Sequence, residues 1–407
     1  MTDQYVFVYN RMHILGGIQS IVLRCAAELI RRGKRVAIVG ENSPPPSIGL
    51  EGATIVTFPK GRSPQEIARQ IPTSSEGINL VVSMDPLSAS LALILCSFLG
   101  NRPKSSIRYL HGVFHPRDFA RESEKRHVHM LNRGLARAIG RRSMFFMNVI
   151  CRESHEKILL QDLSSSEIIP VPIDDRLPAW RPRSIDCVKV CSVGRIVPFK
   201  AYNFEASRIV RQALDLGVPV LWDVYGHGSG IELLRKTIED ERVEEHVVFR
   251  GSLDPCDFDR TVVSYDLFVG MGTAALQAAQ MGVPTLCAID GEGESCYGFL
   301  HEVPHGIVGE AVAGLSRVRI LDAVVQFSTC SLDERRKISA EGVRAANKYS
   351  VGSFLQALND TGRSIGGGPR QWFAFKYASF YYWTNQDSYV KRLYRAVRPF
   401  GRWIRPE

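Results

Sequence analysis

The chain has 407 residues, of which 45% are hydrophobic and 23% charged, so it can form two or three globular domains with sizeable cores. Nine cysteines are scattered singly, with none in a C-x-x-C pair or near a histidine at zinc spacing, so we expect reduced thiols in a cytosolic protein rather than a disulfide or zinc scaffold. The first ten residues lack a basic n-region, and the longest apolar stretch, 87–99, is too short to span a bilayer, so we expect neither a signal peptide nor a membrane-spanning helix.

The formal net charge of +9 is concentrated in two segments. Residues 102–142 carry eleven Lys and Arg against three acids, and residues 370–407 carry eight against two, so the remainder of the chain is net negative. This asymmetry indicates an anionic partner at two surfaces, whether membrane lipid, a phosphate-bearing substrate or nucleic acid.

The first half of the chain alternates strands and helices. A strand at 5–9 leads to a loop that ends in Gly16 and Gly17, followed by an amphipathic helix at 18–32. This order predicts a parallel sheet, and the glycines would let backbone N–H groups approach a ligand, although a full G-x-G-x-x-G is absent. Further strands are expected at 35–39, 54–58, 80–83, 106–110, 144–150 and 168–171, a basic helical segment at 117–142 and a helix at 153–160.

The second half repeats this alternation after a proline-bearing passage at 170–182, and it ends at a glycine-rich segment, 364–369. We therefore predict a first domain at 1–172, a linker at 173–186, a second domain at 187–363 and a basic, aromatic, helical tail at 364–407. Strands of the second domain are expected at 188–193, 220–225, 247–249, 267–269 and 285–288, and helices at 203–216, 231–239, 257–263, 273–281 and within 320–348.

Loops that follow three of these strands suit a diphosphate. These loops contain glycines, some of them just before a predicted helix, and two cations five residues apart. The residues are Gly194, Arg195, Lys200, Gly226, Gly228, Gly272 and Thr273. Because parallel strands end at one edge of a sheet, these loops should gather where open α/β sheets bind ligands, with N–H groups and cations facing phosphate oxygens. The alternative is that tight turns contain glycine, and surfaces contain cations, for structural reasons alone.

Four consecutive blocks of the second half resemble the nucleotide-sugar-binding domain of GT-B glycosyltransferases, in particular the retaining family 4. They are SVGRIVPFK, which is similar to a G-R-x-x-x-x-K donor loop, then VLWDVYGHGSGIELLRKTIED, VVFRGSLDPCDFDRTVVSYDLFV and GTAALQAAQMGVPTL. Their order and spacing match across 170–290, and the first half resembles the acceptor domain more loosely through 16–40 and the YLHG stretch at 109–112. The resemblance implies an α/β GT-B fold, with two Rossmann-like domains facing across a cleft and a C-terminal helical tail that crosses back to the first domain.

The resemblance also implies roles for individual residues. Arg195 and Lys200 match cations that stabilise the departing diphosphate, and His111 matches a histidine near the transferred sugar, so these three are the predicted catalytic residues. For His111, which follows a strand by itself, a structural role is the alternative. The predicted donor-binding residues are Gly16, Gly17, Gly194, Arg195, Lys200, Gly226, Gly228, Arg250, Gly251, Gly272, Thr273 and Gln277.

The family has two paired glutamates that lie eight positions apart, and this chain has a glutamate at neither position. Gln277 occupies the second position and Val269 the first; glutamine can bond a ribose diol, but without the charge assistance of a carboxylate. Glu292 or Glu294 is a candidate replacement, and two surface acids are the alternative interpretation. No paired-Asp cluster or D-x-D motif is present, so we expect no metal and no cofactor besides the nucleotide-sugar co-substrate.

Together these features predict a retaining, metal-independent hexosyltransferase that moves a sugar from a nucleotide-sugar donor to a glycan or lipid-linked glycan in polysaccharide or lipopolysaccharide biosynthesis. The alternatives are a catalytically degenerate homologue that serves as a partner subunit, and a nucleotide-sugar 2-epimerase. The segment 392–405 fits an interfacial helix on anionic lipid, so we expect a cytoplasmic protein with peripheral contact to the inner face of the membrane. Nucleic acid is not an expected partner, because the aromatic residues cluster in one tail rather than across a sheet face.

Overall fold

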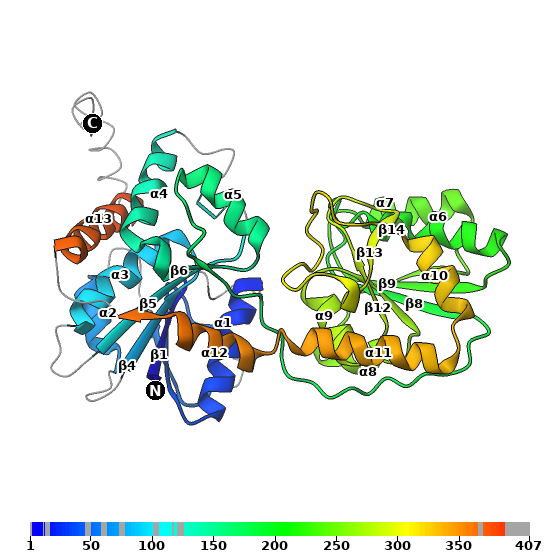
Figure 1. The fold of residues 1–407 in the computed structure, drawn as a ribbon, viewed down its shortest axis with the longest axis horizontal. Helices are drawn as coiled ribbons and strands as arrows, with labels where there is room; N and C mark the ends of the chain where they lie inside the picture. Colours follow the sequence, from blue (N-terminus) through cyan, green and yellow to red (C-terminus); the bar gives the residue numbers. More distant parts are fainter. Residues whose placement is uncertain are drawn as a thin grey trace. The chain divides into compact units, whose positions relative to one another are not determined.

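The computed structural model describes residues 2–10, 12, 17–44, 50–57, 63–72, 78–100, 106–115, 118–119, 126–364 and 369–386. Gly16 and residues 387–407 of the predicted tail lie outside the described residues. The chain forms two compact units: unit 1 comprises Met1–Val171 and Phe354–Glu407, and unit 2 comprises Pro172–Ser353. Each unit is built on one mainly parallel sheet covered by helices (Figure 1).

The sheet of unit 1 has the order β3-β2-β1-β4-β5-β6-β7, so its order reverses between β1 and β4. All pairs along this path are parallel, and the two-residue β15 adds to β5 in the antiparallel sense. The strands are β1 (Thr2–Val8), β2 (Arg35–Gly40), β3 (Ala53–Thr57), β4 (Ile78–Ser83), β5 (Ser106–Val113), β6 (Met144–Phe146), β7 (Glu167–Ile168) and β15 (Arg363–Ser364).

The predicted strand at 144–150 is wrong beyond Phe146. The side chain of Asn148 accepts a hydrogen bond from the backbone N–H of Cys151 at 2.8 Å, so it caps a helix that starts at Val149. An apolar run therefore contains a strand end, a cap and a helix start within seven residues. The helices of unit 1 are α1 (Gly17–Arg31), α2 (Pro64–Gln70), α3 (Pro86–Gly100), α4 (Arg126–Ile139), the 3-10 helix Arg141–Ser143, α5 (Val149–Leu159) and α13 (Pro369–Gln386).

Helix α13 packs against α3 and α4, which brings the C-terminal part of the chain onto the N-terminal sheet unit (Figure 1). The Tyr377 hydroxyl donates to the carbonyl of Leu131 at 3.0 Å, and the Tyr381 hydroxyl donates to Oδ1 of Asn132 at 2.7 Å. Gly134 permits this approach, because a Cβ there would lie 2.0 Å from the Tyr377 hydroxyl oxygen.

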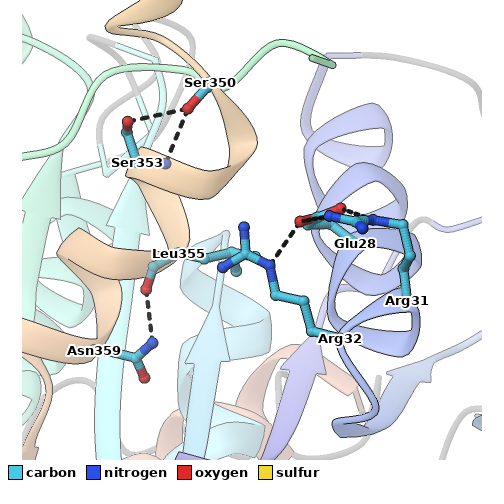
Figure 2. Close-up of polar contacts among 7 residues, drawn as sticks. All are labelled: Glu28, Arg31, Arg32, Ser350, Ser353, Leu355 and Asn359. Atoms are coloured by element: carbon cyan, nitrogen blue, oxygen red, sulfur yellow. Dashed lines mark hydrogen bonds and ion pairs between the residues drawn. The ribbon is translucent and has the colours of Figure 1, made fainter.

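Contacts between residues close in sequence stabilise two helices, α1 and α12. On α1, the Glu28 carboxylate pairs with both Arg31 and Arg32, as Figure 2 shows. On α12 (Val351–Thr361), which begins in unit 2 and continues into unit 1, the Asn359 amide donates to the carbonyl of Leu355 at 3.0 Å (Figure 2). Both are contacts between residues three or four positions apart, which lie on one face of a helix.

The sheet of unit 2 has the order β10-β9-β8-β11-β12-β13-β14 and reverses between β8 and β11. The sequence predicted its five parallel strands but missed β13 and β14, which pair antiparallel at one edge. The strands are β8 (Val188–Val193), β9 (Val220–Tyr225), β10 (Val247–Gly251), β11 (Leu267–Gly270), β12 (Thr285–Ala288), β13 (Ser295–Phe299) and β14 (Val318–Arg319).

Two apolar layers cover the sheet of unit 2, one that includes Trp222 and Phe327 and one that includes Trp180 and Phe268. Trp180 is buried and its indole N–H donates to the carbonyl of Tyr265 at 2.8 Å, so this part of the segment before β8 is packed on unit 2. The helices are α6 (Tyr202–Asp215), α7 (Ile231–Glu241), α8 (Phe258–Val262), α9 (Thr273–Gln280), α10 (Ile320–Thr329), α11 (Leu332–Asn347) and the 3-10 turns Pro255–Asp257 and Leu300–Glu302.

Candidate functional site

The point where the strand order of unit 2 reverses lies between β8 and β11. At such a point the connections leave neighbouring strands in opposite directions, and a crevice opens beyond their carboxyl ends. The loop after β8 carries Arg195 and Lys200, and the loop after β11 carries Gly272 and leads into Thr273 at the start of α9. The residues predicted to bind a diphosphate therefore flank the reversal point.

The two cations form a like-charge pair. Lys200 folds back over its own loop, since a Cβ at Gly194 would lie 2.5 Å from Lys200 Nζ. Arg195 is exposed, with its guanidinium carbon 5.7 Å from the centroid of the Phe199 ring. Burial, together with the nearby charge of Arg195, lowers the pKa of Lys200 to about 8. No carboxylate pairs with either cation in the described part of the chain, so a bound anion would relieve their repulsion.

The glycines after β9 shape the loop that carries Arg195. A Cβ at Gly226 would lie 1.8 Å from the carbonyl oxygen of Gly194, and one at Gly228 would lie 2.2 Å from that of Ile196. The two loops are joined by hydrogen bonds from Gly194 N to Tyr225 O at 3.0 Å and from Ile196 N to His227 O at 2.8 Å. Gly226 and Gly228 thus allow the close approach of two backbones.

The N-terminus of α9 is open to an approaching group. Gly272 has a φ of 69°, and a Cβ added there would meet no atom within 4 Å. The first N–H groups of a helix have no partner inside the helix and favour negative charge. Gln277, one turn further along, is 9% exposed, and its side chain makes no hydrogen bond with the described residues.

Arg250 and Gly251, at the end of β10, lie beside a polar network. Arg250 Nε is 3.1 Å from Oδ1 of Asp223, whose Oδ2 accepts from the Tyr265 hydroxyl at 2.6 Å. Gly251 accepts a hydrogen bond from Gly226 N at 2.8 Å. This strand end is therefore connected to the glycine loops, and the guanidinium of Arg250 is held by an ion pair.

The candidate carboxylates Glu292 and Glu294 are engaged elsewhere. Glu292 pairs with Arg317 at 2.8 Å and Glu294 with Arg208 at 3.3 Å. Both contacts favour the alternative interpretation of these residues as surface acids. The segment 304–312, to which the sequence analysis gave no role, instead lies along the ends of β11 and β12; the closely spaced glycines Gly306 and Gly309 were the available signal.

His111, in unit 1, is completely buried on β5. Its Nδ1 is 2.9 Å from the Ser83 hydroxyl, which also lies 2.9 Å from the Tyr109 hydroxyl, and its Nε2 is buried without a hydrogen-bond partner. Burial lowers the pKa of His111 to about 3, and the neighbouring His155, which sequence reasoning missed, contributes. His111 is therefore a neutral imidazole at physiological pH. Gly17, the first residue of α1, is exposed in the same unit.

Among the residues that the structure describes, no group of three or more His, Cys, Asp or Glu side chains is arranged to hold a metal ion. Across the same ranges, no helix has both the length and the apolar character needed to cross a membrane. The nine cysteines, all of which lie in the described ranges, form no disulfide with one another.

Several solved structures share this architecture. A glycosyltransferase from Rickettsia africae aligns with a TM-score of 0.60 and 11% identity, over 88% of this chain and 98% of that one. HepE from Anabaena in complex with UDP-glucose aligns at 0.57 and 15%, over 88% and 98%. The lipopolysaccharide outer core galactosyltransferase WaaB aligns at 0.54 and 12%, also over 88% and 98%. The chain has the GT-B fold.

The GT-B fold class predicted from the sequence is thereby confirmed. No protein-family model and no curated protein sequence matches the chain. The residues gathered beyond β8 and β11 lie at the reversal point of the sheet of unit 2, the place where open α/β sheets bind ligands.

Proposed function

We propose that this GT-B protein is a glycosyltransferase that moves a sugar from a nucleotide-sugar donor to a glycan acceptor. The observation that carries the proposal is the pair Arg195 and Lys200, which has no carboxylate partner in the described residues and lies across the reversal point from the start of α9. Cleavage of a sugar–phosphate bond leaves negative charge on the diphosphate, and preorganised cations stabilise that charge most in the transition state. The fold shared with HepE, whose structure contains UDP-glucose, and with WaaB supports this assignment.

In this proposal each predicted residue has a role. Arg195, Lys200 and the N–H groups that follow Gly272 bind the diphosphate, in the place where other transferases use a divalent ion, so the reaction is metal-independent. Gln277 accepts from and donates to the ribose hydroxyls. Arg250 and Gly251 lie where the nucleobase would bind. The roles of His111, Gly16 and Gly17 at the transferred sugar stay predictions from the sequence resemblance. Retention of configuration, a hexose donor and family 4 membership rest on the four resembling sequence blocks.

A panel of nucleoside diphosphates and nucleotide-sugars tests the function directly. We expect one nucleoside diphosphate to raise the Tm, because a ligand at a hundred times its Kd adds about 2.7 kcal/mol of stability. The corresponding nucleotide-sugar should be hydrolysed slowly without acceptor, and a glycan acceptor should speed its consumption by taking up the sugar in place of water, with release of the nucleoside diphosphate. No Tm shift with any nucleotide, together with no hydrolysis, would contradict the proposal and favour a degenerate partner subunit.

We further propose that the acceptor is a cell-surface polysaccharide or lipopolysaccharide precursor on an anionic membrane, which the protein contacts peripherally. Helices α4 and α13, which pack together, expose Met130 (62%) and Phe380 (42%), and the exposed cations Arg137 and Lys376 lie about two turns and one turn away from them along the same helices. Large apolar side chains next to cations suit the interface of an anionic bilayer.

Co-sedimentation with vesicles tests this membrane contact. The double variant Met130→Ser, Phe380→Ser is expected to bind vesicles rich in anionic lipid several-fold more weakly than the wild type. Leu177→Ser is the control, because Leu177 is an 87% exposed leucine in unit 2. Equal losses in both variants, or none in either, would contradict the contact.

A further inference from the structure

An aromatic ring, and not a carboxylate, holds the guanidinium of Arg195. The guanidinium carbon lies 5.7 Å from the centroid of the Phe199 ring, and the side chain makes no hydrogen bond or ion pair with the described residues. A cation over the face of an aromatic ring is attracted by the ring's quadrupole out to about 6 Å. Phe199 is 39% exposed, so this pair lies at the surface of unit 2, in the loop that follows β8.

A ring and a carboxylate leave an arginine in different states. Arg250 Nε is 3.1 Å from Oδ1 of Asp223, whose negative charge offsets that of the guanidinium. The Phe199 ring carries no formal charge, so Arg195 keeps its full positive charge for a ligand. Its N–H groups, which have no acceptor in the described residues, can bond phosphate oxygens in the same way.

Phe199 is itself fixed by the loop that follows β12. The backbone N–H of Gly291 donates to the carbonyl of Phe199 at 2.8 Å. The same loop packs closely on α6, since a Cβ at Gly293 would overlap the side chain of Glu205. A hydrogen bond of 2.9 Å between its end residues also closes the turn Val197–Lys200, in which Phe199 lies. The backbone that carries the ring is therefore held on two sides.

We propose that Phe199 is a positioning residue whose ring holds the guanidinium of Arg195 in one orientation, with its N–H groups open to the diphosphate of the donor. This inference rests on the proposed function and deepens it, because Phe199 acts through Arg195 and not on the donor itself. An arginine loses rotamer freedom when it binds a ligand. An arginine that a ring already holds has lost part of that freedom beforehand, so the ring raises the affinity for a diphosphate.

Two substitutions of Phe199 test this role with the nucleoside diphosphate that stabilises the wild type. Phe199→Leu removes the aromatic face and keeps an apolar side chain, whereas Phe199→Tyr keeps the ring. We expect Phe199→Leu to raise the Kd about 3- to 10-fold and Phe199→Tyr to stay within about twofold of the wild type. Phe380→Leu is the matched control and should leave the Kd unchanged, because Phe380 is 42% exposed but lies on α13 in unit 1.

The pH profile of binding separates the orientation of Arg195 from a displacement of the whole loop. Lys200, the next residue after Phe199, owes its low pKa first to burial and then to the charge of Arg195. If only the guanidinium is released, Phe199→Leu should weaken binding at every pH and keep the wild-type midpoint of the decline at high pH. A displaced loop would expose Lys200 to water and raise that midpoint towards the ordinary pKa of 10.5.

The outcomes distinguish this inference from the proposed function. Wild-type affinity in Phe199→Leu, an equal loss of affinity in Phe199→Tyr, or a raised midpoint in Phe199→Leu would each overturn the positioning role and leave the proposed function in place. A wild-type protein that binds no nucleoside diphosphate would overturn both.

Discussion

Replacing Arg195 with alanine is expected to lower kcat/KM for the nucleotide-sugar by about 100- to 1,000-fold, and replacing Lys200 by a similar factor. In the proposed function each substitution removes a cation that faces the departing diphosphate, and the loop has no third cation that could replace its charge. Both variants should also abolish the Tm shift produced by the nucleoside diphosphate. Arg235→Ala is the control, because Arg235 is an exposed arginine of unit 2 paired with Glu232 at 3.1 Å.

The pH dependence of nucleoside diphosphate binding tests the proposal that Lys200 is one of the two cations that bind the diphosphate. Its pKa in the folded protein is about 8, below the ordinary value of 10.5, so the free protein loses this charge as the pH rises through 8. Affinity for the diphosphate should therefore fall above pH 8. Folding stability should change in the opposite sense, because between these pKa values the unfolded chain holds the proton more often and stability rises with pH. Lys200→Arg keeps its charge, and an unchanged decline of affinity in that variant would contradict this assignment.

Gly226→Ala is expected to destabilise the protein by about 3 kcal/mol or more, since it combines backbone strain with a steric overlap. Gly226 has a φ of 154°, and the new Cβ would lie 1.8 Å from the carbonyl oxygen of Gly194. Relief requires the loop of Arg195 to move, so nucleotide binding should be lost even under conditions where the variant stays folded. Urea denaturation and nucleotide titration measure the two effects.

Gly217→Ala isolates the backbone-conformation part of this effect. Gly217 also has a positive φ, of 76°, but a Cβ there would meet no atom within 4 Å. We expect a cost of about 1 kcal/mol, from the left-handed conformation alone, and normal nucleotide binding. Equal destabilisation by the two substitutions would show that the contact between Gly226 and Gly194 has no role in holding the loop.

The sequence predicted the central strands of unit 2 well, because each is a short apolar segment with a glycine or a proline at one of its ends. The expected bounds of β8, β9 and β12 agree with the structure. The same reasoning failed at 144–150, where one apolar run contains the end of β6, the cap Asn148 and the start of α5. It also missed β13 and β14, since such short edge strands are defined by their pairing and not by a local pattern.

The amino-acid sequence alone established the alternating α/β architecture and the glycine and cation loops at one sheet edge, because both follow from local patterns within a few residues. Tertiary structure decided what those residues touch. The close approach of Gly226 to Gly194, the ion pair of Glu292 and the bond from Gly272 to Val308 join segments about 25 to 36 positions apart, which only the strand order brings together. The burial of His111 likewise depends on the side chains of neighbouring strands and helices, and no local pattern around position 111 specifies them.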